Sequence, residues 1–238
     1  MSDVITEFDI LLKSKGKSPF FNNKGFSDRI VEKYNLFFAS NYLLDPFWKI
    51  RFPNESECFY KIYGFVIPGY DEHNNLSYLM IRRDDEKYHI YKEISKEHKH
   101  IFLGDIDRGI GKIWNSHHLI DESPTIFIVE SWTDALSLEE IGYSAIAMNR
   151  VANADTVLAD LVEKYLDIIC RKRIIIMCDS DDIGKEANKN ISLMFSRFGI
   201  KTEIIDSYPV GIKDANEWLV IDRDSFSKEI EKYMKGAL

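Results

Sequence analysis

The second half of this 238-residue sequence predicts an α/β fold built on a mainly parallel sheet, and two patterns support that prediction. Short apolar runs rich in β-branched residues recur from residue 126 onward, and amphipathic stretches separate them. A parallel sheet with helices on both faces requires this alternation, because its strands have no solvated side. The first half is richer in aromatic residues and less regular, which predicts a mixed α/β subdomain. We therefore expect an N-terminal subdomain over residues 1–122 and a C-terminal domain over residues 123–238.

Turn residues and one capped helix organise the first half. Residues 63–68 and 76–81 have the composition of strands, and Asn74-Asn75 between them predicts a hairpin. Ser27 is the type of residue that caps a helix, so we expect a helix over residues 28–36. Its apolar face is expected to consist of Ile30, Val31, Tyr34 and Phe37.

The second half contains four predicted strands and four predicted helices. The strands are expected at residues 126–129, 145–148, 174–178 and 202–205. The helices are expected at residues 134–141, 154–168, 184–198 and 224–238. The last of these helices, with Phe226, Ile230 and Met234 at helical spacing, is expected to close the domain.

Composition excludes several classes of protein. The sequence has 45% hydrophobic and 29% charged residues, as globular proteins do. It has no run near the roughly 18 apolar residues that a membrane span needs and no secretory signal, so we expect a cytoplasmic protein without a membrane partner. The three cysteines are too scattered for a disulfide framework or a zinc ribbon, and we expect reduced, mostly buried thiols. The net charge of −8 argues against nucleic-acid binding by bulk charge, but it suits a carboxylate cluster that binds a divalent metal.

Acidic residues follow the predicted strands at their carboxyl ends. Glu130 follows the first run, with Asp134 one helical turn later; Asp179 and Asp181 follow the third run, and Asp214 follows the fourth. Ligands of open α/β sheets bind at this edge, and clustered carboxylates suit Mg²⁺ or Mn²⁺ better than zinc. Any one of these acids also has the chemistry of a helix N-cap. Their repetition after separate strands favours a metal site.

Three segments resemble motifs of the TOPRIM domain, which bacterial-type primases, topoisomerases and some nucleases share. Residues 129–138 look like the motif E-G-x-x-D-A-L-S-L, residues 179–187 resemble D-x-D-x-x-G-x-x-A, and residues 213–219 resemble the primase-type K-D-P-D-E-x-L. Upstream, residues 25–27 and 63–68 resemble the R-G-F-S and G-R-x-x-F-P segments of bacterial primases. The sequence is thus similar to the catalytic core of bacterial-type (DnaG-like) DNA primases.

That resemblance implies a function and a set of site residues. The function is metal-dependent, template-directed synthesis of short RNA primers on single-stranded DNA from nucleoside triphosphates. The implied catalytic residues are Glu130, Asp134, Asp179 and Asp181, and the implied ligands of Mg²⁺ or Mn²⁺ are Glu130, Asp179, Asp181 and Asp214. The implied nucleic-acid and nucleotide contacts are Arg82, Arg83, Lys87, Lys185 and Lys213.

The resemblance also has gaps. We find neither the zinc-binding module nor the helicase-interaction module of bacterial primases, so we expect template recognition from elsewhere. A short core without these modules hints by analogy at a phage or mobile element. The resemblance itself suggests a replicative helicase as a partner. Ser131 replaces the glycine after the motif glutamate, and Asn216 replaces the second aspartate of K-D-P-D, although its amide oxygen can still coordinate a metal weakly. Asn149 stands where primases commonly have a glycine.

These departures leave two alternatives open beside the primase. One is a TOPRIM nuclease that cuts nucleic acid with the same metal site. The other is a domain that has lost turnover and binds nucleic acid or a protein partner.

The pair His117-His118 completes no zinc motif, and we expect it in a surface or loop role.

Overall fold

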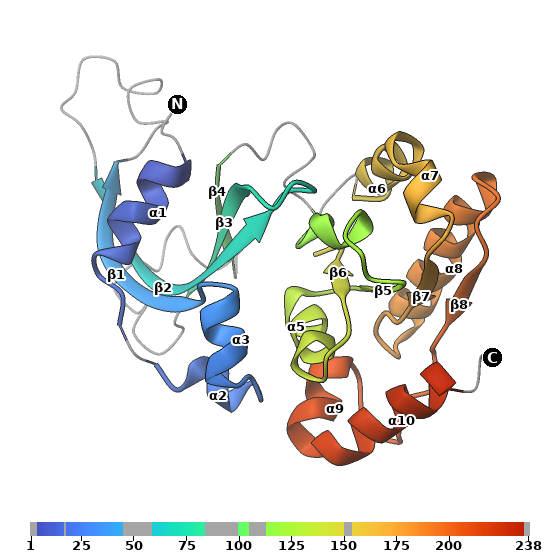
Figure 1. The fold of residues 1–238 in the computed structure, drawn as a ribbon. Helices are drawn as coiled ribbons and strands as arrows, with labels where there is room; N and C mark the ends of the chain where they lie inside the picture. The colour runs from blue at the N-terminus through green and yellow to red at the C-terminus, as the bar shows by residue number, and fades with distance from the viewer. Residues whose placement is uncertain are drawn as a thin grey trace.

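The described part of the chain forms two four-stranded sheets. The structure is a computed structural model that describes residues 4–16, 18–44, 59–83, 100–104, 113–149 and 154–235. For residues 41–44, 59–63, 83, 100, 101, 104 and 154 it describes the backbone alone. The first sheet is antiparallel and the second is parallel, and Figure 1 shows them on opposite sides of the molecule.

The first sheet is an antiparallel meander whose strands follow one another in chain order. They are β1 (Phe37–Leu44), β2 (Phe59–Tyr70), β3 (Leu76–Arg83) and β4 (His100–Gly104). The predicted hairpin is confirmed between β2 and β3. Asn74 has a φ of +61°, in the left-handed region that asparagine tolerates, and the Asp71 carboxylate accepts hydrogen bonds from the backbone N–H groups of His73 and Asn75.

The described residues of this half include three helices: α1 (Val4–Leu12), α2 (Phe20–Asn23) and α3 (Asp28–Lys33). The predicted helix over residues 28–36 is real but shorter, because Asn35 takes a φ of +50° and ends it. Placing Phe37 on its apolar face was wrong. Phe37 begins β1 and packs with Leu11 of α1 in a separate cluster.

The second sheet has the strand order β6-β5-β7-β8, and all its pairs are parallel, as predicted. Its strands are β5 (Thr125–Val129), β6 (Ala145–Ala147), β7 (Arg173–Ile176) and β8 (Thr202–Ile204). A short 3₁₀ helix, η4 (Ser116–Leu119), precedes β5. The four predicted strands are confirmed, although the ladders end one or two residues before three of the apolar runs do.

Six α-helices accompany this sheet in the part of the chain that the structure describes. They are α5 (Trp132–Glu140), α6 (Ala154–Lys164), α7 (Leu166–Ile169), α8 (Asp182–Arg197), α9 (Ala215–Ile221) and α10 (Arg223–Lys235). The single helix predicted over residues 154–168 is wrong, since Tyr165 leaves helical geometry and separates α6 from α7. The closing helix is confirmed as α10, which buries Phe226 and Ile230. No helix among the described residues has the length and apolar character to cross a membrane.

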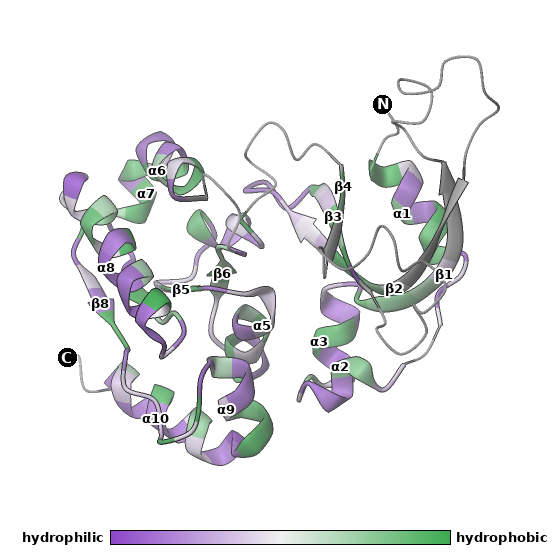
Figure 2. Cartoon of the chain, turned by 180° about the vertical axis from the view of Figure 1, so that it is seen from behind, coloured by the Kyte–Doolittle hydropathy of each residue, from purple (hydrophilic) through white to green (hydrophobic). Residues whose placement is uncertain are grey.

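Alternate side chains of the parallel strands enter two hydrophobic clusters. In β5, Phe127 and Val129 join one cluster with α5, α9 and α10, whereas Ile126 and Ile128 join the other with α6 and α8. Successive side chains of a strand point to opposite faces, so a fully apolar strand supplies both clusters. Figure 1 shows these helices on the two sides of the sheet, and Figure 2 shows hydrophilic and hydrophobic residues alternating along α8, as an amphipathic helix requires.

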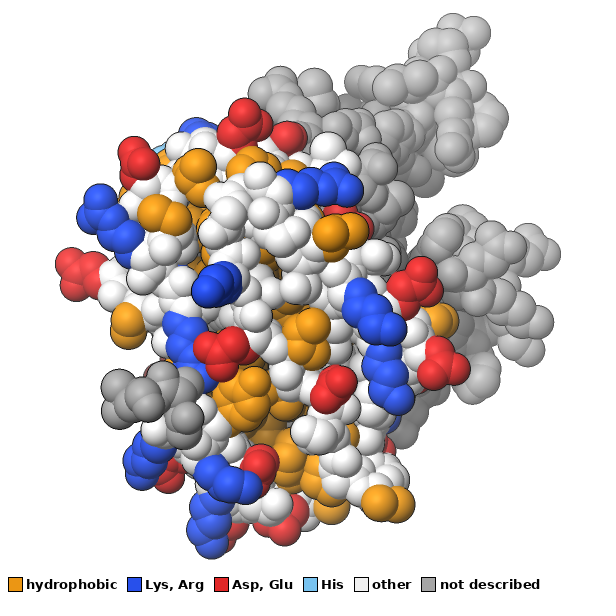
Figure 3. Space-filling model, turned by 90° about the vertical axis from the view of Figure 1, so that its right-hand side faces the viewer, with side chains coloured by type: hydrophobic (Ala, Val, Ile, Leu, Met, Phe, Trp, Pro, Cys, Tyr) orange, Lys and Arg blue, Asp and Glu red, His pale blue; other side chains and the backbone are white. Residues whose placement is uncertain are grey.

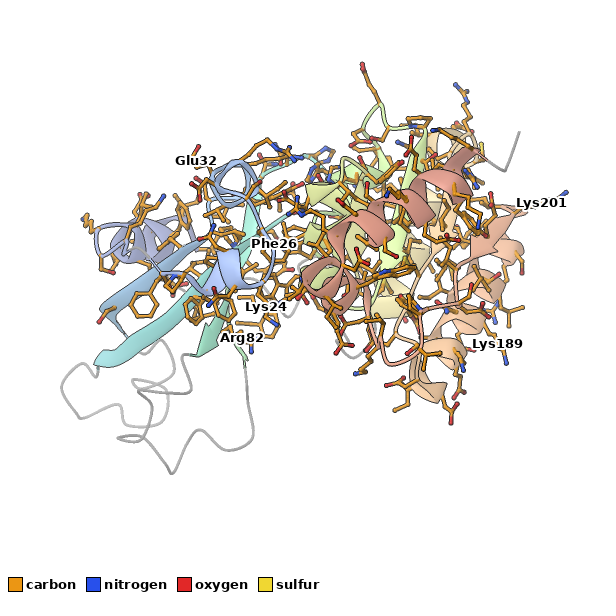
Figure 4. The ribbon with its side chains drawn as sticks, turned by 90° about the horizontal axis from the view of Figure 1, so that it is seen from below. Lys24, Phe26, Glu32, Arg82, Lys189 and Lys201 are labelled. Carbon is orange, nitrogen blue, oxygen red and sulfur yellow. The ribbon has the colours of Figure 1, made fainter. Side chains whose placement is uncertain are left out.

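The two halves share one of these clusters. Trp132 is buried at the start of α5, with its ring centroid 6.5 Å from those of both Phe21 and Phe26. Figure 4 shows Phe26 at the junction between the two halves. Polar contacts reinforce it: the backbone N–H and the hydroxyl of Ser27 both donate to Glu140 over 2.9 Å. Ser27 begins α3 as predicted, but its side chain binds α5 instead of capping its own helix.

Candidate active site

The acidic residues singled out in the sequence follow neighbouring parallel strands. Ile128 of β5 pairs with Ile176 of β7, and the Met177 N–H donates to the Ile128 carbonyl. Continuing this register places Glu130 beside Cys178, directly before Asp179. Both Glu130 and Asp179 are 7% exposed. The carboxyl edge of the parallel sheet therefore carries buried acidic side chains, as predicted.

Asp134 is held rigidly at the first turn of α5. Its Oδ2 accepts hydrogen bonds from the hydroxyl of Ser131 at 2.5 Å and from the Ser131 N–H at 3.3 Å. The Asp134 N–H in turn donates to the hydroxyl oxygen of Ser131 at 3.4 Å, and this bond and the Ser131 N–H bond together form a capping box. Its Oδ1 accepts the backbone N–H of Asn216 at 3.0 Å. Ser131, which replaces the usual motif glycine, thus orients the neighbouring acid.

Like charges surround Asp134. Burial, together with the nearby carboxylates of Asp214 and Asp179, raises the pKa of Asp134 to about 7. Burial likewise raises the pKa of Asp214, with Asp179 and Glu217 adding to the shift. Asp134, on the first turn of α5, therefore lies near Asp179, which follows β7, and near Asp214, which precedes α9.

Asp181 and Asp214 also cap helices. Asp181 is the N-cap of α8, where its Oδ1 accepts the Gly184 N–H at 2.8 Å, and Asp214 is the N-cap of α9, where its Oδ1 accepts the Glu217 N–H at 2.7 Å. The helix-cap interpretation of these acids is therefore correct. Each aspartate can cap a helix and also belong to the site, because the cap fixes the position of its carboxylate among the other acidic residues.

Gly184 allows the chain to fold back on Asp179. A Cβ atom at position 184 would lie 2.2 Å from the carbonyl oxygen of Asp179. Such a contact is impossible without moving the backbone of the Asp179–Asp181 turn. The glycine of this motif is thus required by the close approach of α8 to the end of β7.

Lys213 joins the two acidic loops. Its ammonium lies 3.0 Å from Oδ2 of Asp179 and 3.7 Å from Oδ2 of Asp181. The backbone N–H of Ser180 donates to the Lys213 carbonyl at 2.8 Å, so the β8–α9 connection is fastened to the β7–α8 turn. The sequence predicted Lys213 as a nucleotide contact; here it forms ion pairs with two predicted catalytic residues.

Tyr208 is a site residue that the sequence did not indicate. Its hydroxyl lies 3.0 Å from the carbonyl oxygen of Cys178 and 3.4 Å from that of Met177, at the end of β7. Burial raises the pKa of Tyr208 well above its usual value, and the carboxylates of Asp134 and Asp179 raise it further. A single tyrosine in a loop has no periodicity or motif that would reveal this position.

Asn149 explains one departure from the primase pattern. Its φ of +51° lies in the left-handed region, which glycine and asparagine adopt more readily than other residues. Its N–H donates to the Glu130 carbonyl at 2.7 Å, and its side-chain oxygen accepts the Trp132 N–H at 3.1 Å. Asparagine can therefore stand in for glycine here and supports the backbone on both sides of Ser131.

Asn216 is a link between the halves of the chain. Its side chain is buried, and its amide nitrogen donates to the Lys24 carbonyl at 2.9 Å and to the hydroxyl of Ser137 at 3.0 Å. A carboxylate could not make the bond to the Lys24 carbonyl, because it has no proton to donate. The amide nitrogen of Asn216 therefore has a structural role, and weak metal coordination by its amide oxygen stays a prediction.

The predicted basic residues are dispersed. Arg82 lies in the antiparallel sheet, with its guanidinium 5.0 Å from the ring centroid of Phe20, which stacks on Phe65. Lys185 is exposed on the first turn of α8. The side chain of Arg83 and the whole of Lys87 lie outside the described residues. Figure 3 shows the right-hand side of Figure 1 with Lys and Arg side chains interspersed among Asp and Glu.

The expected surface role of His118 is wrong, because His118 is buried. Its Nδ1 lies 2.6 Å from Asp121 and its Nε2 lies 2.7 Å from Glu139. Burial alone would lower the pKa of His118, but these two carboxylates outweigh it and raise the pKa. A histidine that bridges two carboxylates can be buried as a charged group, which the sequence pattern did not reveal. Of the cysteines, Cys178 is buried and Cys170 is exposed, whereas Cys58 lies outside the described residues.

The acidic residues fit a hard divalent cation in their chemistry. The donors are carboxylate oxygens, which Mg²⁺ and Mn²⁺ prefer. Burial and mutual repulsion raise the pKa values of Asp134 and Asp214, and a cation would relieve the repulsion. Within the described residues, no three His, Cys, Asp or Glu side chains are grouped closely enough to hold one ion. Mg²⁺ usually binds through one or two carboxylates together with water and substrate phosphates, which this arrangement allows.

Comparisons with known proteins agree with this geometry. Residues 127–219 match the family described as Toprim-like. No curated protein matches the sequence. Among solved structures, the Aquifex aeolicus primase (zinc-binding and RNA polymerase domains) is 18% identical with a TM-score of 0.67; the match covers 96% of this chain and 57% of that one.

Two further solved structures have the same fold. A DnaG primase catalytic domain bound to single-stranded DNA is 15% identical with a TM-score of 0.62, and the match covers 92% of this chain and 70% of that one. The bacteriophage T7 primase domain, from a complex with T7 DNA polymerase and an RNA/DNA hybrid, is 17% identical with a TM-score of 0.57, covering 89% and 87% of the two chains. Residues 127–219 are thus a Toprim-like domain, and the described chain has the fold of a DnaG-type primase catalytic core.

Proposed function

We propose that this chain is a primase-like catalytic core that joins nucleoside triphosphates into short RNA primers on a single-stranded DNA template. The observation that carries the proposal is the group of carboxylates from Asp134, Asp179, Asp181 and Asp214 at the carboxyl edge of a Toprim-like sheet. The similar structures include primases bound to single-stranded DNA and to an RNA/DNA hybrid, which supports a nucleic-acid substrate.

In this proposal the acidic residues hold Mg²⁺ or Mn²⁺ and a triphosphate. Asp179, Asp181 and Asp214 would be ligands, and a bound cation would neutralise charge on the attacking and leaving oxygens. Glu130, at the end of β5, is the candidate acid/base group or a further ligand. Asp134 is the candidate that orients the others, because Ser131 and Asn216 hold its two oxygens in place.

The antiparallel sheet is the proposed template guide. Arg82 lies on the ring of Phe20, an arrangement that keeps the guanidinium in a fixed position from which it can meet a phosphate. In this proposal residues 1–122 bind the template, and residues 123–238 carry out the chemistry. A replicative helicase is the proposed protein partner.

Incubation with single-stranded DNA, labelled ribonucleotides and Mg²⁺ or Mn²⁺ tests the proposal. New oligomers identify a primase, shortened DNA identifies a nuclease, and binding without either product identifies a domain without turnover. The double variant Asp179→Ala/Asp181→Ala should lose the activity. The control Asp160→Ala/Glu163→Ala removes the same charge from the exposed side of α6 and should keep it. An active Asp179→Ala/Asp181→Ala protein would overturn the assignment of the site.

A further inference from the structure

The ammonium of Lys213 lies where a cation would be expected to bind. Its Nζ is 3.0 Å from Oδ2 of Asp179 and 3.7 Å from Oδ2 of Asp181. Asp179 and Asp181 are proposed ligands of the divalent metal. A positive charge supplied by the chain itself therefore neutralises the same carboxylates that the metal would use.

The backbone on which Lys213 stands is fixed. The Lys213 carbonyl accepts the Ser180 N–H at 2.8 Å, and the hydroxyl of Ser180 donates to the Ile212 carbonyl at 3.2 Å. On its other side, the Lys213 N–H donates to Oε2 of Glu217 at 2.6 Å. These bonds anchor the residue beside the Asp179–Asp181 turn whether or not its ammonium stays there.

The Lys213 side chain, in contrast, is exposed and flexible. The Lys213 side chain is 53% exposed, whereas that of Asp179 is 8% exposed. A lysine has four flexible methylene groups, so its ammonium can swing into solvent without moving the backbone. The ion pair thus joins one buried carboxylate to one mobile cation.

We propose that Lys213 is an internal counter-ion of the Asp179–Asp181 pair, and that a divalent cation displaces its ammonium when it binds. This inference rests on the metal site of the proposed function. A divalent cation bound at these oxygens would repel the ammonium that lies beside them. Lys213 would hold the two carboxylates together in the metal-free protein and would weaken cation binding, because its ion pairs must first be broken.

Titration calorimetry with Mn²⁺, without nucleic acid or nucleotide, measures this competition directly. Lys213→Met removes the charge but keeps much of the side-chain length, and it should bind Mn²⁺ roughly three- to tenfold more tightly than the wild type. Lys213→Arg keeps the positive charge and should bind Mn²⁺ about as weakly as the wild type does.

Lys201→Met is the matched control for the loss of one positive charge. Lys201 is exposed and precedes β8, so it lies at the opposite edge of the sheet from the acidic residues. Figure 4 shows Lys201 pointing outward. Its replacement should leave Mn²⁺ affinity within about twofold of the wild type, since exposed charges at such distances are screened by salt. An equal gain in Lys213→Met and Lys201→Met would overturn the proposal in favour of a general charge effect.

Chemical labelling tests the displacement itself. Acetylation of lysines by a water-soluble ester, read by peptide mass spectrometry, should become severalfold faster at Lys213 when Mg²⁺ saturates the protein. Lys201 is the internal standard, and its rate should not change. A Lys213 rate that stays constant or falls with Mg²⁺ would show that the ammonium is not displaced.

Failure of this inference differs from failure of the proposed function. If the wild type binds Mn²⁺ and Lys213→Met binds it equally or more weakly, Lys213 is no competitor, and primer synthesis remains possible. If Mn²⁺ affinity rises in Lys213→Met but no primers form, the counter-ion is real and the proposed reaction is wrong. If wild type and variant both fail to bind Mn²⁺ or Mg²⁺, the counter-ion proposal falls together with the metal site.

Discussion

The backbone N–H of Asn216 donates a hydrogen bond to Oδ1 of Asp134 over 3.0 Å, although 82 positions separate the two residues in the sequence. The side chain of Asn216 reaches the Lys24 carbonyl and the hydroxyl of Ser137. One residue thus connects the acidic site, α5 and the N-terminal half. The position that resembles a metal ligand in the sequence therefore helps to hold the Asp134 carboxylate in place.

Restoring the motif acid with Asn216→Asp should destabilise the protein. The carboxylate would face the Lys24 carbonyl without a proton to donate and would add a negative charge beside Asp134, at a cost of about 2 kcal/mol or more. Urea denaturation measures the change. Asn190→Asp, the same substitution on the exposed side of α8, should change the free energy of unfolding by less than about 0.5 kcal/mol. Equal stability of Asn216→Asp and the wild type would contradict the structural role.

Gly184→Ala should displace the Asp179–Asp181 turn of the proposed site. The added Cβ would lie 2.2 Å from the Asp179 carbonyl oxygen, so α8 or the Asp179–Asp181 turn must shift. We expect a loss of about 1–3 kcal/mol in unfolding free energy, typical of an overpacked site, and a loss of cation affinity. Asn190→Ala in the same helix is the control and should bind Mn²⁺ as the wild type does. Normal cation affinity in Gly184→Ala would mean that the turn tolerates the shift.

Tyr208→Phe should weaken cation binding while keeping the packing of the aromatic ring. The ring remains, but the Cys178 carbonyl loses a hydrogen bond of 3.0 Å, which contributes about 1 kcal/mol. We expect reduced Mn²⁺ affinity, measured by calorimetry, because the turn after β7 is less well held. The control is Tyr233→Phe on α10, which removes a hydrogen bond to the Ile204 carbonyl and should not alter cation binding. Identical Mn²⁺ affinities in Tyr208→Phe and Tyr233→Phe would show that Tyr208 does not position the site.

The pH dependence of stability should reveal the charged pair of His118 and Glu139. Burial opposes the charge on Glu139, but His118 and Lys33 outweigh it and lower the pKa of Glu139 to about 2, from an ordinary 4.5. A lowered carboxyl pKa gives stability that is present above pH 4.5 and is lost as the pH falls toward 2. The raised pKa of His118 gives stability that is present below pH 6.5 and is lost as the pH rises through the raised value.

Thermal melts of the wild type and Glu139→Gln between pH 3 and pH 8 test this pair, since titrations of groups that do not interact with Glu139 cancel in the difference. The variant should be less stable by about 3 kcal/mol near pH 5–6, because it removes one of the two carboxylates beside the buried charge of His118 and also the ion pair between Glu139 and Lys33. The difference should shrink toward pH 3 and toward pH 8. Glu231→Gln, which breaks an exposed pair with Lys235 on α10, should show no such maximum. A difference that is constant with pH would contradict a charged His118.

Local patterns in the sequence determined much of the architecture. Continuous apolar runs predicted the four parallel strands, because a strand buried on both faces must be apolar at every position. Asn74 marked the hairpin through its tolerance of positive φ. The acids after successive strands marked the edge where Glu130 and Asp179 lie, because parallel strands bring their carboxyl ends to one side.

Tertiary structure alone decided what these residues contact. Lys213 meets Asp179 and Asp181, Tyr208 meets the end of β7, and His118 is buried between Asp121 and Glu139. The strand order also brings together β5 and β7, which are not consecutive in the chain. Periodicity reports whether a position is buried, but it carries no information on which distant side chain supplies its charge or hydrogen bond. Those partners are fixed by the packing of the whole chain.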